Sequence, residues 1–144
     1  MKKLFILLAF FSLISCSDEV LPDETPSLEL VSIGPSQVVE LKDSIHIVVR
    51  YEDGDGDLGE NSPDAKNLYL WDERIDLVYQ YRIKELVPNE AEVAISGTLV
   101  LELPNTVITN GSNSEQVTYT LWVKDRAGHE SNRITAGPIT VVSP

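Results

Sequence analysis

Apolar residues recur at every second position along much of this sequence, and no other feature limits the fold as strongly. In SIHIVVRY (44–51) the apolar positions run from Ile45 to Tyr51. GTLVLEL (97–103) and QVTYTLWV (116–123) repeat the pattern. Successive side chains of a strand point to opposite faces, so this period predicts β-strands that bury one face.

Five more segments have the composition of strands. They are rich in β-branched and aromatic residues, and clusters of Pro, Gly, Asn and Asp separate them. They cover residues 28–33, 37–41, 67–73, 76–83 and 133–142. No segment reads as a convincing helix. With 42% hydrophobic residues the chain is expected to fold, and roughly seven or eight short strands predict an all-β, two-sheet β-sandwich.

One hairpin carries a resemblance. VTYTLWVKDRAGHESNRI (117–134) resembles the last hairpin of bacterial immunoglobulin-like and fibronectin-III-like domains. That hairpin often ends in an Asp-x-Ala-Gly-x-x-Ser turn, matched here by Asp125, Ala127, Gly128 and Ser131. The resemblance implies an immunoglobulin-like sandwich over residues 28–144, with Tyr119 in the tyrosine-corner role. Residues 52–66 would then form the B–C loop, 104–115 the E–F loop and 125–131 the F–G turn.

The N-terminal segment predicts export. Lys2 and Lys3 precede an apolar run of 11 residues, whereas a bilayer-spanning helix needs about 20. We interpret residues 1–15 as a signal peptide. Cys16 is the single cysteine and has no disulfide partner in the chain. Leu-Ile-Ser-Cys (13–16) resembles the bacterial lipobox, which implies that Cys16 is lipidated and becomes the mature N-terminus.

The residues after Cys16 predict a location. Ser-Asp-Glu (17–19) resembles the acidic export signal of surface lipoproteins in Bacteroidota, which implies a lipid-anchored, surface-exposed protein of the outer membrane. Residues 16–27 are expected to form a flexible acidic tether, because Ser17 to Ser27 include two prolines and four acids. The net charge of −12 argues against a nucleic-acid partner, since few cations are available to neutralise phosphates.

YEDGDGDLG (51–59) predicts a cation site. Its alternate carboxylates can turn inward around a hard cation that takes about six to eight oxygens, and the glycines permit the curling. Counting on from Asp53, Asn61 and Asp64 fall at the ninth and twelfth positions. The stretch resembles calcium loops of the EF-hand, dockerin and thrombospondin type 3 kinds, and DGDGDLG resembles a loop of uncharacterised Bacteroidota surface lipoproteins. It departs from the EF-hand pattern at the sixth position, which is Leu58.

We therefore predict a structural Ca²⁺ site, with Mg²⁺ as the alternative metal and an ion-free, solvated connector as the alternative role for the loop. The predicted ligands are Asp53, Asp55, Asp57, Asn61 and Asp64. In an immunoglobulin-like sandwich the B–C and F–G loops lie at the same end, so Asp125 is expected beside them as a further ligand.

Four aromatic residues lie on two neighbouring predicted strands: Tyr69, Trp71, Tyr79 and Tyr81. They form either a platform for sugar rings or a protein partner, or a second layer of the core, which we favour. No residues mark a catalytic centre. The sequence predicts a non-catalytic binding or structural module at the cell surface. The alternatives are a glycan-capture or enzyme-accessory subunit and a plain structural spacer.

Overall fold

The computed structural model describes residues 23–88 and 91–144, and this part of the chain is built from β-strands. Its eight strands are β1 (Ser27–Gly34), β2 (Gln37–Val39), β3 (Ile45–Asp53), β4 (Leu68–Asp72), β5 (Leu77–Tyr81), β6 (Ile95–Leu103), β7 (Ser114–Val123) and β8 (Ile134–Val142). Each overlaps one predicted strand. The described residues contain no helix of the length and hydropathy that a bilayer crossing requires.

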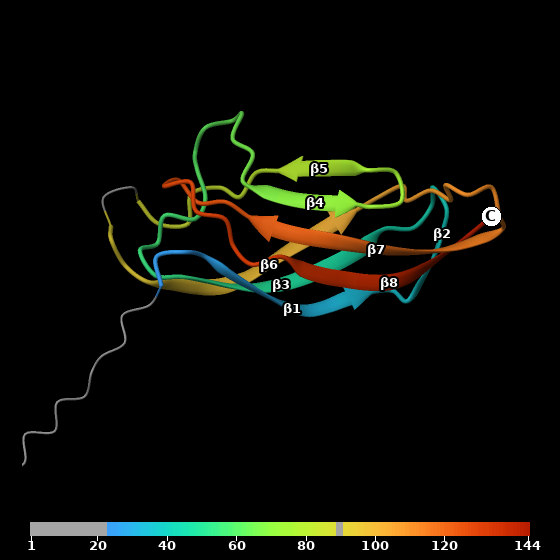
Figure 1. The fold of residues 1–144 in the computed structure, drawn as a ribbon, viewed down its shortest axis with the longest axis horizontal. Coiled ribbons are helices and arrows are strands. Elements are labelled where there is room, and N and C mark those ends of the chain that lie inside the picture. Colours follow the sequence, from blue (N-terminus) through green and yellow to red (C-terminus); the bar gives the residue numbers. More distant parts are fainter. Residues whose placement is uncertain (1–22, 89–90) are drawn as a thin grey trace, which may run out of the picture.

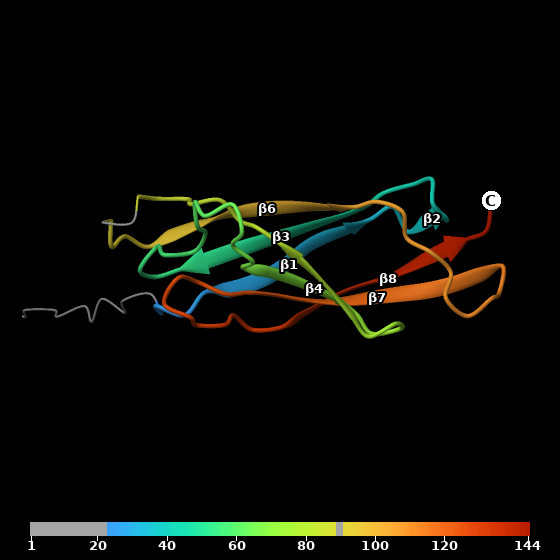
Figure 2. The same cartoon turned by 90° about the horizontal axis from the view of Figure 1, so that it is seen from above.

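The strands form two sheets that face each other. One sheet has the order β1-β3-β6 and the other the order β2-β8-β7-β4-β5. All pairs are antiparallel except β2 with β8. Figure 2 shows β1, β3 and β6 in one layer and β4, β7 and β8 in the other. The predicted all-β sandwich is confirmed.

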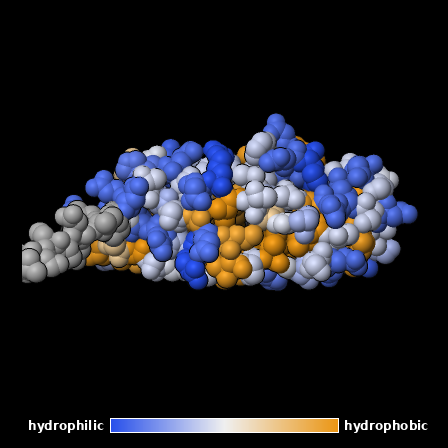
Figure 3. All heavy atoms as spheres, turned by 60° about the horizontal axis from the view of Figure 1, so that its bottom comes forward, coloured by the Kyte–Doolittle hydropathy of each residue, from blue (hydrophilic) through white to orange (hydrophobic). Residues whose placement is uncertain are grey.

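The core lies between the two layers. Ile45, Ile47 and Val49 of β3 are fully buried, as are Leu70 of β4 and Leu121 of β7. Their alternate neighbours on β3 face outward, which is the period that the sequence displayed. On the side where β1 and β8 come forward, apolar side chains also reach the surface among polar ones (Figure 3).

Three segments meet at one end of the sandwich. β1 begins where the antiparallel β3 ends, because Ser27 pairs with Glu52. The turn between β7 and β8 lies at the same end, since the N–H of Ala127 donates to Asp57 Oδ2 over 2.8 Å. In Figure 1 this end is on the left, where the chain enters the domain. The expected meeting of the two loops at one end is therefore confirmed.

The last residues of the predicted tether lie against the domain. The N–H of Gly54 donates to the carbonyl oxygen of Asp23 over 2.9 Å, Pro26 is buried, and Ser27 already belongs to β1. Residues 23–27 of the predicted tether therefore lie against the domain or join its first strand. Residues 1–22, which include the predicted signal peptide and Cys16, lie outside the described part.

Candidate metal site

Asp53 occupies an inward position of β3. The strand buries every second residue from Ile45 to Tyr51, and the same period carries Asp53 to the inside at its end. Only 2% of Asp53 is exposed. A carboxylate at a position that otherwise carries apolar residues conflicts with the core pattern, and such conflicts concentrate at functional sites.

The loop after β3 curls back over this carboxylate. The N–H of Leu58 donates to Asp53 Oδ2 over 2.8 Å, and the fully buried Leu58 side chain fixes the loop to the core. The N–H of Asp57 lies 3.4 Å from Asp55 Oδ1. As a result, one carboxylate oxygen of each of Asp53, Asp55 and Asp57 lies within 4.8 Å of the other two.

Two glycines make this curl possible. Gly56 has a φ of 76° and Gly59 a φ of 93°, a region that residues with a Cβ rarely adopt. A Cβ at Gly56 would also collide with the carbonyl oxygen of Val93, and one at Gly59 with that of Lys84. The glycines therefore let two other stretches of backbone pack directly against the acidic loop.

Two buried oxygens of the three carboxylates lack hydrogen-bond donors in the described part of the chain, whereas Asp53 Oδ2 and Asp57 Oδ2 each accept a backbone N–H. Asp53 Oδ1 and Asp57 Oδ1 are buried, and neither has a partner among the described residues. Within the same part of the chain, no lysine or arginine forms a salt bridge with Asp53, Asp55 or Asp57. An unsatisfied buried polar group costs about 1–3 kcal/mol, and a charged group costs more.

The electrostatics follow from this geometry. Burial, followed by the negative charges of Asp55 and Asp57, raises the pKa of Asp53 to about 6, although the Leu58 N–H opposes the shift. Burial, and then the negative charge of Asp125, raises the pKa of Asp57. The two shifts share their causes: burial disfavours the charged carboxylates, and neighbouring carboxylates repel them. A bound cation would offset both effects.

Asp125 borders the group and is engaged elsewhere. Its Oδ1 accepts hydrogen bonds from the N–H groups of Gly128 (2.7 Å) and His129 (2.8 Å). Its Oδ2 lies 3.0 Å from His129 Nδ1. Asp125 therefore stabilises its own turn through these hydrogen bonds. Its effect on Asp57 is electrostatic, because its negative charge raises the pKa of Asp57. It is not one of the three grouped carboxylates.

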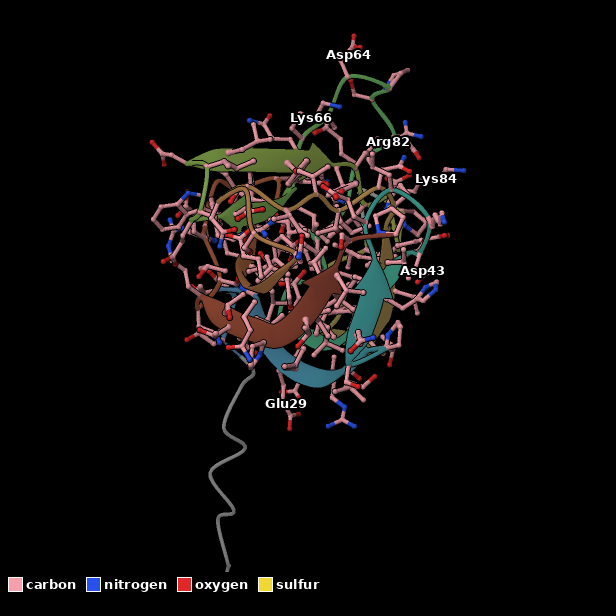
Figure 4. The ribbon with its side chains drawn as sticks, turned by 90° about the vertical axis from the view of Figure 1, so that its right-hand side faces the viewer. Glu29, Asp43, Asp64, Lys66, Arg82 and Lys84 are labelled. Carbon is pink, nitrogen blue, oxygen red and sulfur yellow. The ribbon has the colours of Figure 1, made fainter. Side chains whose placement is uncertain are left out.

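Two further predicted ligands are placed away from the group. The side-chain amide of Asn61 donates to Glu85. Asp64 is exposed, and Figure 4 shows it at the outer end of the β3–β4 connection, pointing away from the sandwich. Of the six predicted metal ligands, the structure groups Asp53, Asp55 and Asp57.

The predicted aromatic platform is divided between two faces. Tyr79 and Tyr81 pair with Leu70 and Leu68, and both pack against the core. Tyr69 and Trp71 alternate with these inward leucines along β4 and so lie on the outer face. The four aromatic residues therefore do not form one row.

Two residues that the predicted platform did not include also lie on the outer face. The ring of Trp122 stacks on Tyr69, with centroids 5.1 Å apart and planes at 11°. The guanidinium of Arg133 lies 3.9 Å from the centroid of Trp122. The pairing of Tyr69 with Trp122 across β4 and β7 sets this stack, and only the register between two distant strands reveals it.

No protein-family model matches this chain, and comparisons with curated proteins and with solved structures likewise return no significant match.

Proposed function

We propose that this chain is a non-catalytic module of the cell surface, held at the outer membrane by lipid on Cys16 and stabilised by Ca²⁺ at Asp53, Asp55 and Asp57. The observation that supports the ion most directly is the pair of buried carboxylate oxygens without donors, on Asp53 and Asp57. A cation bound there would satisfy both oxygens and cancel the repulsion among three neighbouring charges.

Calcium fits this site better than magnesium. The grouped oxygens come from a strand end and a tightly curled loop, which is an irregular frame. Ca²⁺ accepts irregular arrangements of about six to eight oxygens, whereas Mg²⁺ demands near-ideal octahedral geometry and keeps several waters. Backbone carbonyls and water would complete the coordination. The role is structural, because the ion lies between packed segments of one domain.

Thermal unfolding of the mature chain in detergent tests the ion. Ca²⁺ that binds only the folded state raises the melting temperature, and the rise is expected to saturate at roughly 10⁻⁴–10⁻³ M. Asp55→Asn should abolish the rise. Asp64→Asn is the matched control, because it removes one charge from the same connection without touching the grouped oxygens, and it should retain the rise. Equal melting temperatures in Ca²⁺ and in chelator would overturn the proposed site.

The anchor has its own test. Cys16→Ala should move the protein out of the detergent phase in a phase-partition experiment, because a lipid supplies about 0.8 kcal/mol per buried CH₂. Replacing Ser17, Asp18 and Glu19 together with alanine should keep the anchor and reduce protease access on whole cells. Unchanged partition of the Cys16 variant would refute lipid anchoring.

The alternative function is glycan capture or an enzyme-accessory role. The outward position of Tyr69 and Trp71 favours it, whereas Tyr79 and Tyr81 face the core. A saccharide hit on a glycan array that Trp71→Ala removes would support capture. Silence on the array would favour a structural or protein-binding module.

A further inference from the structure

A cavity of about 360 Å³ adjoins the candidate metal site. It is lined by Glu24, Asp55, Asp57, Ala91, Glu92 and Arg126. These residues come from four separate stretches of the chain, including the stretch that enters the domain. Two of the three grouped carboxylates therefore face the same cavity as two carboxylates that the loop itself does not contain.

The segments that carry Glu24 and Glu92 are already fixed beside the loop. On one side of Glu24, the carbonyl oxygen of Asp23 accepts the N–H of Gly54 over 2.9 Å. On the other, Pro26 is buried. Next to Glu92, the carbonyl oxygen of Val93 lies so close to Gly56 that no Cβ fits between them. The backbone next to each glutamate is thus held beside the acidic loop, while both glutamates are exposed at the cavity.

The charges around the cavity do not balance. Four carboxylates line it together with one guanidinium. That guanidinium, on Arg126, donates to the carbonyl oxygen of Gly59 over 2.7 Å. Asp53, which is buried with an unpaired Oδ1, adds a further carboxylate close to Asp55 and Asp57. Without a cation, repulsion opposes the approach of the entering chain to the loop.

We propose that Ca²⁺ at this site completes its coordination with Glu24 and Glu92, and so fastens the entering chain to the sandwich. This inference rests on the proposed function, because it extends the ligand set of the same ion. Asp53, Asp55 and Asp57 hold the ion at the domain, and Glu24 brings the chain that leads to the membrane anchor. Calcium then sets how closely that chain is held at this end of the domain.

Calorimetric titration of the mature chain with CaCl₂ measures the effect on affinity. Glu24→Gln and Glu92→Gln keep the shape of each side chain and remove its charge. Each should raise the Kd for Ca²⁺ roughly tenfold, because affinity follows the number of charged ligands. Glu60→Gln is the matched control: Glu60 is exposed on the β3–β4 connection and does not line the cavity. Its Kd should equal that of the wild type.

Hydrogen exchange at the N–H of Gly54 measures how firmly the entering chain is held against the loop. The N–H of Gly54 donates to Asp23, next to Glu24, so Ca²⁺ should slow its exchange in the wild type. In Glu24→Gln at saturating Ca²⁺, this protection should be lost while the ion is still bound.

Two failures are distinguishable. A wild-type chain that binds no Ca²⁺ would overturn the proposed function and this inference together. A wild type that binds Ca²⁺, with Glu24→Gln and Glu92→Gln matching it in both Kd and Gly54 exchange, would overturn only the part played by the two glutamates.

Discussion

Two groups of carboxylates in this sandwich, each with a buried aspartate, differ in whether a cationic side chain pairs with them. Where β4 turns toward β5, Asp72 is 1% exposed. Its Oδ2 lies 2.7 Å from Arg74 Nη2, and Arg74 Nη1 lies 3.1 Å from Glu115 Oε2. At the end where the chain enters (Figure 1), Asp53, Asp55 and Asp57 cluster, and no lysine or arginine of residues 23–88 and 91–144 forms a salt bridge with them.

The difference teaches what each group requires. The Arg74 group is complete within the chain: hydrogen bonds from Thr109 and the charge of Arg74 hold the pKa of Glu115 below its usual range, despite the opposing effect of burial. In the Asp53 group the pKa of the buried carboxyl moves the other way, to about 6. In the first group a guanidinium of the chain pairs with the carboxylates, whereas in the second no described lysine or arginine does so, and the three carboxylates could hold a metal ion.

The largest expected effect comes from removing the internal cation. Arg74→Met leaves Asp72 buried without its partner, and breaking a buried pair costs about 3–5 kcal/mol of the free energy of unfolding. Urea denaturation measures the loss, and Ca²⁺ should not restore it. The control is Arg50→Met: Arg50 pairs with Glu29 on the surface, where both side chains are more than half exposed, so the cost should stay below about 1 kcal/mol.

Asp53→Asn should instead raise the free energy of unfolding in the absence of Ca²⁺. Asparagine keeps an acceptor for the Leu58 N–H and removes the buried charge. The gain is at most about 3 kcal/mol near pH 7, the free-energy equivalent of a pKa raised from 3.8 to about 6. Urea denaturation in chelator measures it, and the calcium-induced rise in melting temperature should disappear. A variant that is less stable than the wild type in chelator would show that the charge of Asp53 does not destabilise the ion-free protein.

The gain from Asp53→Asn should depend on pH. The folded-state pKa of Asp53 lies above its unfolded value, so the folded state binds the proton more tightly. The stability from that proton is complete below about pH 4 and is lost as the pH rises through about 6. In chelator the difference between variant and wild type should therefore be largest above pH 6 and vanish toward pH 4. A difference that stays constant across this range would assign the shift to another group.

The smallest expected effect belongs to Asp125→Asn. The amide oxygen still accepts from the N–H groups of Gly128 and His129, and the amide nitrogen takes the place of Oδ2 beside His129 Nδ1, so the turn is kept. The charge that raises the pKa of Asp57 is lost. The ion-free protein should gain less than about 1 kcal/mol. The calcium-induced rise in melting temperature should persist. Loss of that rise would instead place Asp125 among the ligands.

The strands and the acidic triad were predictable because both depend on local spacing. A period of two fixes which residues of β3 face inward, and Asp53, Asp55 and Asp57 are close because a short curled loop carries them. Counting on to Asn61 and Asp64 was less reliable, because those positions suit a loop between two helices. Here the chain leaves a strand, and Asn61 bonds to Glu85 instead.

Contacts between residues that are distant in the sequence could not be predicted from local sequence patterns. In β4, Tyr69 and Trp71 alternate with Leu68 and Leu70, so both faces are apolar and the period does not tell which is outer. On the outer face Trp122 of β7 stacks on Tyr69, a contact between strands that are distant in the sequence. Likewise, nothing local to Glu24 or Glu92 indicates that folding brings them to the cavity beside Asp55.

The antiparallel pairing of β1 with β3 has a mechanical consequence for a domain held by its N-terminal side. β1 starts at the end where the chain enters and runs along the long axis of the molecule (Figure 1). A pull on the chain before Ser27, directed away from that end, acts along the strand. It loads the rungs from Ser27–Glu52 to Gly34–His46 in shear, together, instead of peeling them one by one. The side chain of Asn132 holds β1 further, because it forms hydrogen bonds with both the N–H and the carbonyl oxygen of Leu28.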